Sequence, residues 1–343
     1  MLSLYIIVNI YKDIVFSLNL DELPPLLQGK KVFAIIDKKV DFLYGNFLPF
    51  TKVIIEASEK NKKIETVDII IKNLIELGAD RDCFILGIGG GIITDITGFT
   101  ASIYKRGVQF GFVPTTFLAQ VDAAIGGKNG VNTLSYKNMV GTITLPDFIF
   151  SYPGFLSTLD QKNYNCGIAE MLKTFIISDE KMYHKAISLF KRNPLYNKSI
   201  EPELSGLIKR TAQLKCKIVN KDIYEQDKRR LLNLGHTFAH AIEKNSDEVT
   251  HGEAVSIGTI IASKISTKLG ILNTITLENI ISDYKSLSLP VTSPVEISKL
   301  YDAISKDKKK EGNKIHFILP TKIGSVKEHL LSIEELKSLS LDF

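Results

Sequence analysis

Residues 83–102, CFILGIGGGIITDITGFTAS, constrain the fold more than any other stretch of the chain. The apolar run at its start indicates a buried strand, and the residues after the glycine cluster indicate a helix. In open α/β sheets, glycines between a strand and a helix let the backbone approach a phosphate at the helix N-terminus. The order GIGGG differs from the GxGxxG fingerprint, and glycines after a strand also form ordinary tight turns. Both interpretations are compatible with this stretch.

Other apolar runs in the first half of the chain predict further strands of the same parallel sheet. The run at 32–36 ends at Asp37, and an acidic residue at the carboxyl end of such a strand is typical of a nucleotide site. Similar runs occupy 52–57, 108–114 and 147–150. Between them, apolar residues recur at helical spacing at Ile64, Val67, Ile71, Leu74 and Leu77. Gly78 is well placed to end that helix.

The second half of the chain has a different pattern, which is mostly helical from residue 163 onwards. A chain of 343 residues also exceeds the length at which one hydrophobic core usually stops growing. We therefore expect an α/β protein in which residues 1–155 form a parallel-sheet domain and residues 156–343 a mostly α-helical one. The apolar amino terminus indicates a first strand, because it lacks the basic region and cleavage site of a signal peptide.

The composition argues against several classes of function. The net charge of +5 comes from lysines spread along the chain, without the arginine-rich arm typical of nucleic-acid binding. No run of eighteen uncharged apolar residues occurs, so we expect no membrane span. The three cysteines, Cys83, Cys166 and Cys216, are far apart and lack CxxC spacing. This pattern predicts neither a disulfide framework nor a thiolate zinc site, and it fits a reducing cytoplasm.

Half of the six histidines lie in residues 233–253, NLGHTFAHAIEKNSDEVTHGE. His236 and His240 are four apart, so a helix would present both on one face, and His251 follows a short polar loop. Neutral imidazoles suit Zn²⁺, and a catalytic zinc usually has three protein ligands and one open position. Two histidines would therefore leave a carboxylate to be found. The alternative is an ordinary pair of histidines on a helix surface or in a core.

Glu170 is the candidate for the missing carboxylate, because it lies in the otherwise apolar run GIAEML. Lys173 is one helical turn away, so the simpler interpretation is a minor ion pair on a helix surface. Gly126 to Lys128 read GGK, which is not a Walker motif. A lysine flanked by glycines can nevertheless approach a phosphate closely.

Several blocks in a fixed order carry a resemblance to a known family. They are SEKNKKIET, GGGIITDITGFTAS, YKRGVQFGFVPTTFLAQVDAAIGGKNGVN, GIAEMLK, LLNLGHTFAHAIE, HGEAVSIG and a late DKK. Over essentially its whole length the chain resembles the 3-dehydroquinate synthases of the shikimate pathway. The wider sugar phosphate cyclase group shares many of these blocks.

The resemblance implies a Rossmann-like amino-terminal domain that binds NAD and a helical carboxy-terminal domain that holds a divalent metal ion, Zn²⁺ or Co²⁺. It places the active site in the cleft between the two domains. Its metal ligands would be Glu170, His236 and His251. His240 would then be an acid/base neighbour on the substrate side and not a ligand.

The other site residues are likewise implied by the resemblance. The cofactor contacts would be Asp37, Glu59, Lys62, Gly90, Gly91, Asp95, Thr115, Thr116, Asp122, Lys128, Lys137, Phe155 and Thr158. The substrate contacts and catalytic groups would be Asp122, Lys128, Lys137, Asn138, Lys173, Lys215, Arg229, Asn233, His240, Lys308 and Lys309. Arg106 would reach the phosphate pocket of a partner subunit, which implies a homodimer.

The implied reaction converts 3-deoxy-D-arabino-heptulosonate 7-phosphate to 3-dehydroquinate and phosphate. It proceeds by transient NAD-dependent oxidation, phosphate elimination, reduction and an intramolecular aldol closure. The substrate carries a carboxylate and a phosphate, so a cluster of Lys and Arg is its expected complement.

Three alternatives compete with this interpretation. A sister cyclase, such as an amino-dehydroquinate or cyclitol synthase, would share the fold, metal and cofactor, but Lys137, Asn138, Arg229 and Asn233 stand here as in the dehydroquinate synthases. A metal-dependent NAD alcohol or glycerol dehydrogenase would have little use for so many phosphate-reaching cations. A non-catalytic relative is disfavoured, because every expected metal and substrate position is filled.

Overall fold

The computed structural model describes residues 14–134, 136–308 and 314–340. These residues divide into two compact units. The first extends to Leu156 and also includes Cys216–Tyr224, whereas the second comprises Ser157–Lys215 and the chain from Glu225 onward. Most of the predicted first strand lies outside the described residues, but Ile14–Phe16 at its end does form a strand.

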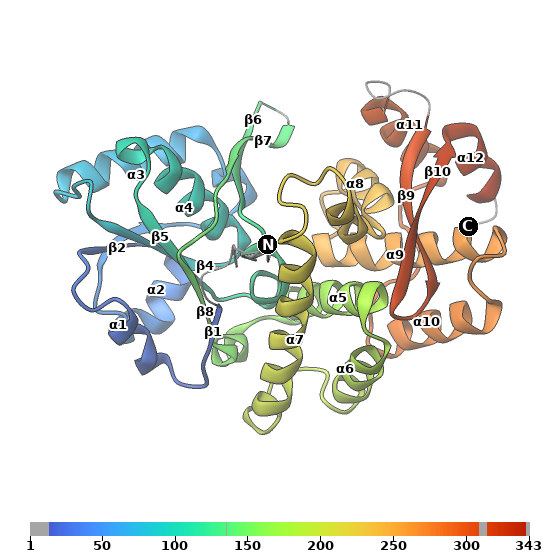
Figure 1. Cartoon of the computed structure of the whole chain (residues 1–343), viewed down its shortest axis with the longest axis horizontal. Coiled ribbons are helices and arrows are strands. Elements are labelled where there is room, and N and C mark those ends of the chain that lie inside the picture. Colours follow the sequence, from blue (N-terminus) through green and yellow to red (C-terminus); the bar gives the residue numbers. More distant parts are fainter. Residues whose placement is uncertain (1–13, 135, 309–313, 341–343) are drawn as a thin grey trace, which may run out of the picture. The chain divides into compact units, whose positions relative to one another are not determined.

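Within the described residues, the first unit is built on a six-stranded sheet in the order β1-β8-β5-β4-β2-β3 (Figure 1). All neighbouring strands run parallel, as predicted. The strands are β1 Ile14–Phe16, β2 Val32–Asp37, β3 Thr51–Ile55, β4 Phe84–Gly89, β5 Gln109–Pro114 and β8 Phe148–Ser151. Phe33–Ile36 of β2 are buried without alternation, as expected for a central strand that is covered on both faces.

Along the chain, the helices of this unit connect successive strands of the sheet. They are α1 Leu23–Leu26, α2 Lys38–Tyr44, α3 Ile64–Glu76 and α4 Gly91–Ile103, with short helical turns η1 Leu20–Glu22, η2 Gly45–Phe47, η3 Glu59–Asn61, η4 Tyr104–Arg106 and η5 Ala119–Ala123. Connections of this kind are what parallel strands require. Their apolar faces cover the sheet around a core that includes Ile36, Leu86, Val113, Phe150 and Phe155.

Helix α3 confirms the predicted helix but corrects its buried face. Val67, Ile70 and Leu74 are buried, whereas Ile64 and Leu77 are each 44% exposed. Ile64 is the first residue of α3 and Leu77 is its C-cap, so both lie at the helix ends, beyond the buried stripe. Gly78 ends the helix as predicted, with φ +71° and its N–H 3.0 Å from the carbonyl oxygen of Ile75.

A hairpin that the sequence did not predict follows the Gly126–Lys128 stretch. It consists of β6 Lys128–Thr133 and β7 Tyr136–Ile143, which are antiparallel. Strand β7 is exposed along most of its length, so it lacks the apolar alternation that signals a strand. The two strands approach closely at a pair of glycines, because a Cβ on Gly141 would lie 2.2 Å from the carbonyl oxygen of Asn129.

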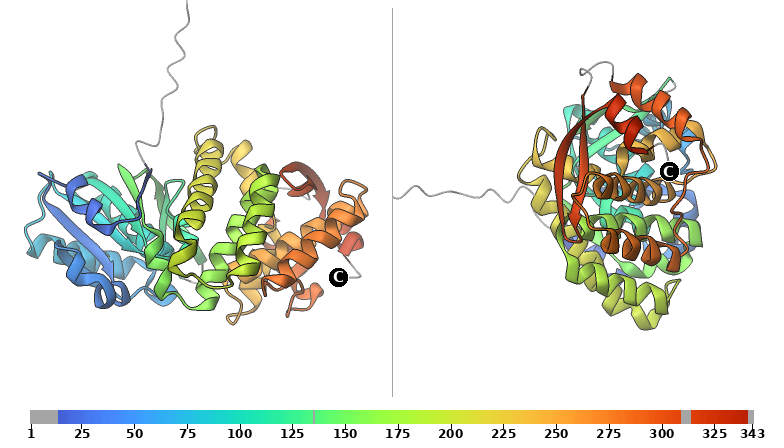
Figure 2. Two further views of the ribbon diagram at one scale, coloured as in Figure 1. Left: turned by 90° about the horizontal axis from the view of Figure 1, so that it is seen from below. Right: turned by 90° about the vertical axis from the view of Figure 1, so that its right-hand side faces the viewer.

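The second unit is mostly helical, as predicted, and α9 is its central element. Its elements are α5 Gln161–Ser178, α6 Glu180–Arg192, α7 Glu201–Val219, η7 Lys198–Ile200, η8 Lys228–Asn233, α8 His236–Asn245, α9 His251–Lys268, α10 Thr274–Ser286, α11 Ile297–Lys308, α12 Ile333–Ser340, β9 Lys314–Lys322 and β10 Ser325–Ser332. The 3₁₀ turn η6 Pro153–Thr158 and helix α7 each contain residues of both units. The antiparallel ribbon of β9 and β10 runs beside α9 (Figures 1 and 2).

None of Cys83, Cys166 and Cys216 takes part in a disulfide. In the part of the chain that the structure describes, no helix is both long enough and apolar enough to cross a bilayer.

Candidate active site

Three predicted metal ligands converge in the second unit. Glu170 lies in the middle of α5, and His236 and His251 are the first residues of α8 and α9. Oε1 of Glu170 lies 3.1 Å from Nε2 of His251 and 3.6 Å from Nε2 of His236. One donor atom from each residue falls within 4.8 Å of the other two. Two imidazoles and a carboxylate are a donor set typical of catalytic Zn²⁺.

His240 is outside this set of donors. Its ring lies one turn along α8, edge-on to the His236 ring at a centroid distance of 5.4 Å, and its side chain is exposed. The i, i+4 spacing therefore located the site but paired the wrong histidines. The second imidazole comes from α9, which a local spacing rule cannot anticipate.

Glycines next to both ligand histidines bring the three helices together. Gly252 follows His251, and a Cβ there would lie 2.2 Å from Cα of Cys166 in α5. Gly258 lies against Gly235 of the neighbouring helix, since its Cβ would come 2.1 Å from the Gly235 carbonyl oxygen. Side chains at these positions would push the helices apart and separate the ligands.

The N-terminal turn of α9 is fixed by a capping box. The Thr250 hydroxyl accepts from the N–H of Glu253, and the Glu253 carboxylate accepts from the N–H of Thr250 at 2.8 Å. These bonds satisfy helix-end groups and define where α9 begins. They therefore place His251 at the first helical position.

Glu170 is completely buried, and so is its neighbour Lys173, whose Nζ lies 2.6 Å from Oε2. The interpretation as a minor surface ion pair is therefore wrong. Burial by itself raises the pKa of Glu170, but the charge of Lys173 and the hydrogen bond with His251 outweigh it and hold that pKa well below its usual range. The carboxylate is thus ionised and ready to bind a cation.

The two histidines differ in protonation. Burial, reinforced by the charge of Lys173, lowers the pKa of His236 to about 3. Its Nδ1 lies 3.2 Å from the carbonyl oxygen of Leu234, to which it can only donate, so Nε2 is free to bind a metal ion. Burial also lowers the pKa of His251, but its hydrogen bonds with Glu170 and Glu243 prevail and raise that pKa to about 10. Metal binding would displace the proton from Nε2. The residues present fit a divalent ion of the zinc class.

The predicted nucleotide residues of the first unit follow the carboxyl ends of the strands. The strand order reverses at β2, which has β3 on one side and β4 on the other, and ligands bind at such switch points. Asp37 ends β2 and caps α2, accepting from the N–H groups of Lys39 and Ala57. Gly90 caps α4 beside Thr116, because a Cβ on Gly90 would lie 2.9 Å from its methyl carbon.

A hydrogen-bonded chain joins four further predicted residues in this unit. Nζ of Lys62 lies 2.5 Å from the Asp95 carboxylate and 2.6 Å from the side-chain oxygen of Asn138. Asn132 extends the chain, since it accepts from the N–H of Asn138 at 2.9 Å and donates to the Glu59 carboxylate at 2.8 Å. A cavity of about 400 Å³ lies beside it and is also lined by Lys137.

Other predicted residues of the first unit are more scattered. Phe155 is 1% exposed and packs edge-on against Tyr44 in the core, so its side chain is not available to a cofactor. Arg106 is exposed in η4, which directly follows the C-terminal end of α4. The remaining ones are Gly91 in α4, Thr115 after β5, Asp122 in η5 and Lys128 in β6.

The remaining predicted residues of the second unit include two buried cations, Lys215 in α7 and Arg229 in η8. Asn233 is exposed and donates to the Glu225 carboxylate at 2.6 Å. Thr158 is exposed in η6. Lys308 is the last residue of α11, and Lys309 lies outside the described residues.

Sequence reasoning missed three residues that contact the predicted site. Asn132 and Glu225 are polar residues without a recognisable pattern, and their contacts depend on the folded chain. Glu243 had a signal, because it lies seven residues after His236 and therefore on the same face of α8.

Comparison with known proteins identifies the family. The model of the 3-dehydroquinate synthase N-terminal region matches residues 52–166, and that of the C-terminal region matches residues 167–310. The 3-dehydroquinate synthase of Sulfurovum sp. (strain NBC37-1) is 35% identical over 92% of this chain and 91% of its own length. That of Pyrococcus abyssi (strain GE5 / Orsay) is 37% identical over 92% of this chain and 94% of its own.

A solved structure of a related cyclase has the same architecture. It is ValA, 2-epi-5-epi-valiolone synthase from Streptomyces hygroscopicus subsp. jinggangensis 5008, with NAD⁺ and Zn²⁺ bound. Its TM-score is 0.88 at 29% identity, and the match covers 96% of each chain. The family models and the curated relatives, in contrast, all carry the description 3-dehydroquinate synthase. The chain belongs to the 3-dehydroquinate synthase family.

Proposed function

We propose that this chain converts 3-deoxy-D-arabino-heptulosonate 7-phosphate to 3-dehydroquinate and phosphate, and that the residues described above carry the reaction. The family acts as lyases on a phosphate-bearing substrate. The observation that supports the proposal most strongly is the convergence of Glu170, His236 and His251 from three helices. Packing of a helical core does not account for such a set, because burying a carboxylate costs free energy.

Glu170, His236 and His251 would hold Zn²⁺ or Co²⁺, and the carboxyl edge of the sheet in the first unit would hold NAD. When bound, NAD⁺ supplies a hydride acceptor that later returns the hydride, and the divalent ion supplies a Lewis acid that lowers the pKa of a substrate hydroxyl. Lys62 would orient the cofactor end of the site, because it already links Asp95 and Asn138.

His240 would move the proton. It is exposed on α8 next to His236, and an imidazole can both accept and donate a proton. It would accept the proton of the substrate hydroxyl as that hydroxyl is oxidised, and return the proton when the ketone is reduced.

The cations would bind the two anionic groups of the substrate. Lys215 and Arg229 are buried, and desolvated cations bind carboxylates and phosphates strongly. Lys128 and Lys137 are exposed on the β6–β7 hairpin, where a phosphate can reach them. By fixing the substrate conformation, these contacts would make the elimination and the aldol closure intramolecular, which can lower the barrier by several kcal/mol.

Assembly and location are further parts of the proposal. Arg106 lies at the opposite end of α4 from Gly90, so it would serve the phosphate pocket of a partner subunit, and we propose a homodimer. The lack of a disulfide among Cys83, Cys166 and Cys216 fits a cytoplasmic enzyme. The proposal involves no nucleic acid and no membrane.

A comparison of two substrates tests the proposal against its rivals. The purified protein, with NAD⁺ and Zn²⁺, is given either the heptulosonate phosphate or a seven-carbon sugar phosphate that lacks the carboxylate, and the products are identified by NMR. We expect 3-dehydroquinate from the first substrate only. Turnover of the second alone would assign the chain to a sister cyclase, and steady NADH formation would assign it to a dehydrogenase.

A further inference from the structure

The second ring nitrogen of His251 faces a carboxylate. Nε2 lies 3.1 Å from Oε1 of Glu170, and Nδ1 lies 3.4 Å from Oε1 of Glu243. When a metal ion occupies Nε2, an imidazole keeps its proton on Nδ1, and an acceptor there fixes both the tautomer and the ring orientation. We propose that Glu243 is the positioning residue of the metal centre, which holds His251 so that Nε2 points at the ion. This inference rests on the metal site proposed above.

The placement of Glu243 on α8 supports this role. It lies two turns after His236, so one face of α8 carries a metal ligand at its start and an acceptor for the other histidine further along. The Glu243 side chain is 16% exposed and that of His251 is 30% exposed. Their contact is therefore largely shielded from water and from salt.

His236 shows why Glu243 is the residue to test. Its Nδ1 contact is with the carbonyl oxygen of Leu234, a backbone group that mutation cannot remove. Of the two Nδ1 contacts, that of His251 is made by a side chain. The contact that orients His251 can therefore be removed by mutating Glu243, without changing any metal ligand.

A merely structural role for Glu243 would be to tie α8 to α9. The two helices already meet at Gly235 and Gly258, where the backbones approach too closely for a side chain. Loss of Glu243 should therefore leave α8 and α9 packed together. It should change only the affinity of the site for metal and the orientation of His251. Metal affinity and metal spectroscopy separate the two roles, since a structural tie would change thermal stability first.

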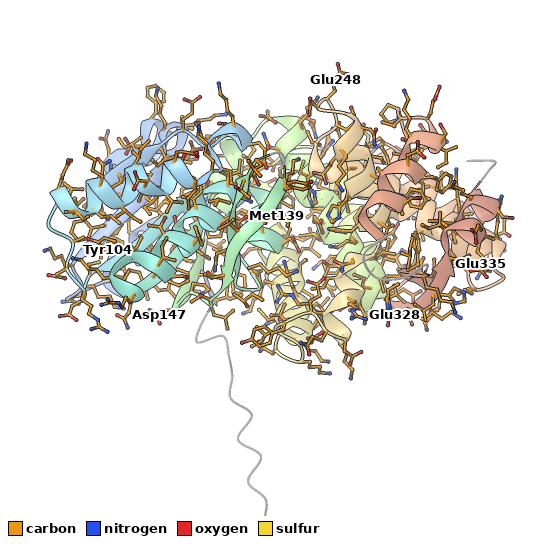
Figure 3. The ribbon with its side chains drawn as sticks, turned by 90° about the horizontal axis from the view of Figure 1, so that it is seen from above. Tyr104, Met139, Asp147, Glu248, Glu328 and Glu335 are labelled. Atoms are coloured by element: carbon orange, nitrogen blue, oxygen red, sulfur yellow. The ribbon has the colours of Figure 1, made fainter. Side chains whose placement is uncertain are left out.

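The test compares Glu243→Ala, Glu243→Asp and a control, Glu248→Ala. Glu248 is exposed in the loop between α8 and α9, so its removal changes the net charge equally (Figure 3). The dissociation constant for Zn²⁺ is measured by competition with a chromophoric chelator, and Co²⁺-loaded protein gives a visible spectrum. We expect Glu243→Ala to raise the Zn²⁺ dissociation constant about 10–100-fold and to alter the Co²⁺ spectrum. Glu243→Asp, which withdraws the carboxylate by one methylene, should raise it less, and the control should match the parent.

Each outcome is decisive. If the parent protein binds no metal ion, the metal site of the proposed function fails, and the role of Glu243 with it. If the parent binds and Glu243→Ala matches it in affinity and spectrum, the positioning role alone is overturned. An equal loss in Glu248→Ala would reduce the effect to net charge and also overturn it. Should Glu243→Ala not fold, Glu243→Asp decides: a raised constant supports the role, and an unchanged one contradicts it.

Discussion

Glu170 shows how much one buried side chain depends on its neighbours. Taking a carboxylate out of water is costly, and here Lys173 compensates at Oε2 while two imidazoles converge on Oε1. The same neighbours keep the pKa of Glu170 low, so the oxygen that faces the histidines is charged. This setting suits a ligand for a cation, whereas a surface ion pair would need no such enclosure.

At this scale, Glu170→Gln and His251→Ala should each remove bound metal. Each substitution deletes one of three donors, and a zinc site rarely survives with two. Metal content is measured by mass spectrometry after gel filtration, with His184→Ala as the control because His184 is exposed on α6. The ligand assignment is wrong if both site variants retain as much metal as the control.

Lys62 allows a matching test in the first unit. Lys62→Met removes the cation that links Asp95 and Asn138 and keeps much of the side-chain volume. We expect the dissociation constant for NAD⁺ to rise about 10–100-fold, because an interaction with a charged group is worth roughly 1.5–3 kcal/mol. Isothermal titration provides the measurement, and Lys72→Met, on the exposed face of α3, is the control. Unchanged binding in Lys62→Met would place NAD elsewhere.

Among the elements, close helix contacts at glycines hold the three helices that carry the candidate metal ligands. Helix α9 lies against α5 at Gly252 and against α8 at Gly258. Gly252 directly follows His251. Gly258 packs on Gly235, which is the residue before His236. The precision of the site therefore comes from backbone contact between helices and not from the ligands themselves.

Gly252→Ala tests this dependence. The new Cβ would lie 2.2 Å from Cα of Cys166, so a backbone must move, and overpacking of this kind typically costs about 1–3 kcal/mol. We expect a lower midpoint in urea unfolding together with weaker Zn²⁺ binding. Gly206→Ala is the matched control: a Cβ there meets nothing within 4 Å, and replacing a helical glycine should stabilise α7 by about 0.5–1 kcal/mol. Normal metal affinity in Gly252→Ala would contradict the proposed dependence.

The elements also show where sequence reasoning succeeds and fails. The buried parallel strands and the long helices were predicted, because continuous apolar runs and helical spacing are strong local signals. The β6–β7 hairpin was missed, since β7 is exposed and its pairing depends on the close approach of Gly130 and Gly141. The buried face of α3 was shifted, because the sheet decides which apolar residues it covers.

For the molecule as a whole, each compact unit contains one part of the proposed site. The predicted nucleotide residues follow strand ends of the first unit, and the candidate metal ligands lie on helices of the second. Local spacing located the metal centre but chose His240 as a ligand, because it cannot bring together residues as distant in sequence as Glu170 and His251. The resemblance to a family supplied that pairing, and the fold brings the three donors together.

The most direct test of the account is the ratio of phosphate released to NADH accumulated, measured as Zn²⁺ is restored to chelator-treated protein in the presence of NAD⁺ and the heptulosonate phosphate. Oxidation and reduction occur within one turnover, so we predict phosphate release that rises with added Zn²⁺ while NADH stays near zero, and no release from Glu170→Gln. Phosphate release that is independent of metal, or NADH that accumulates in step with phosphate, would contradict the account.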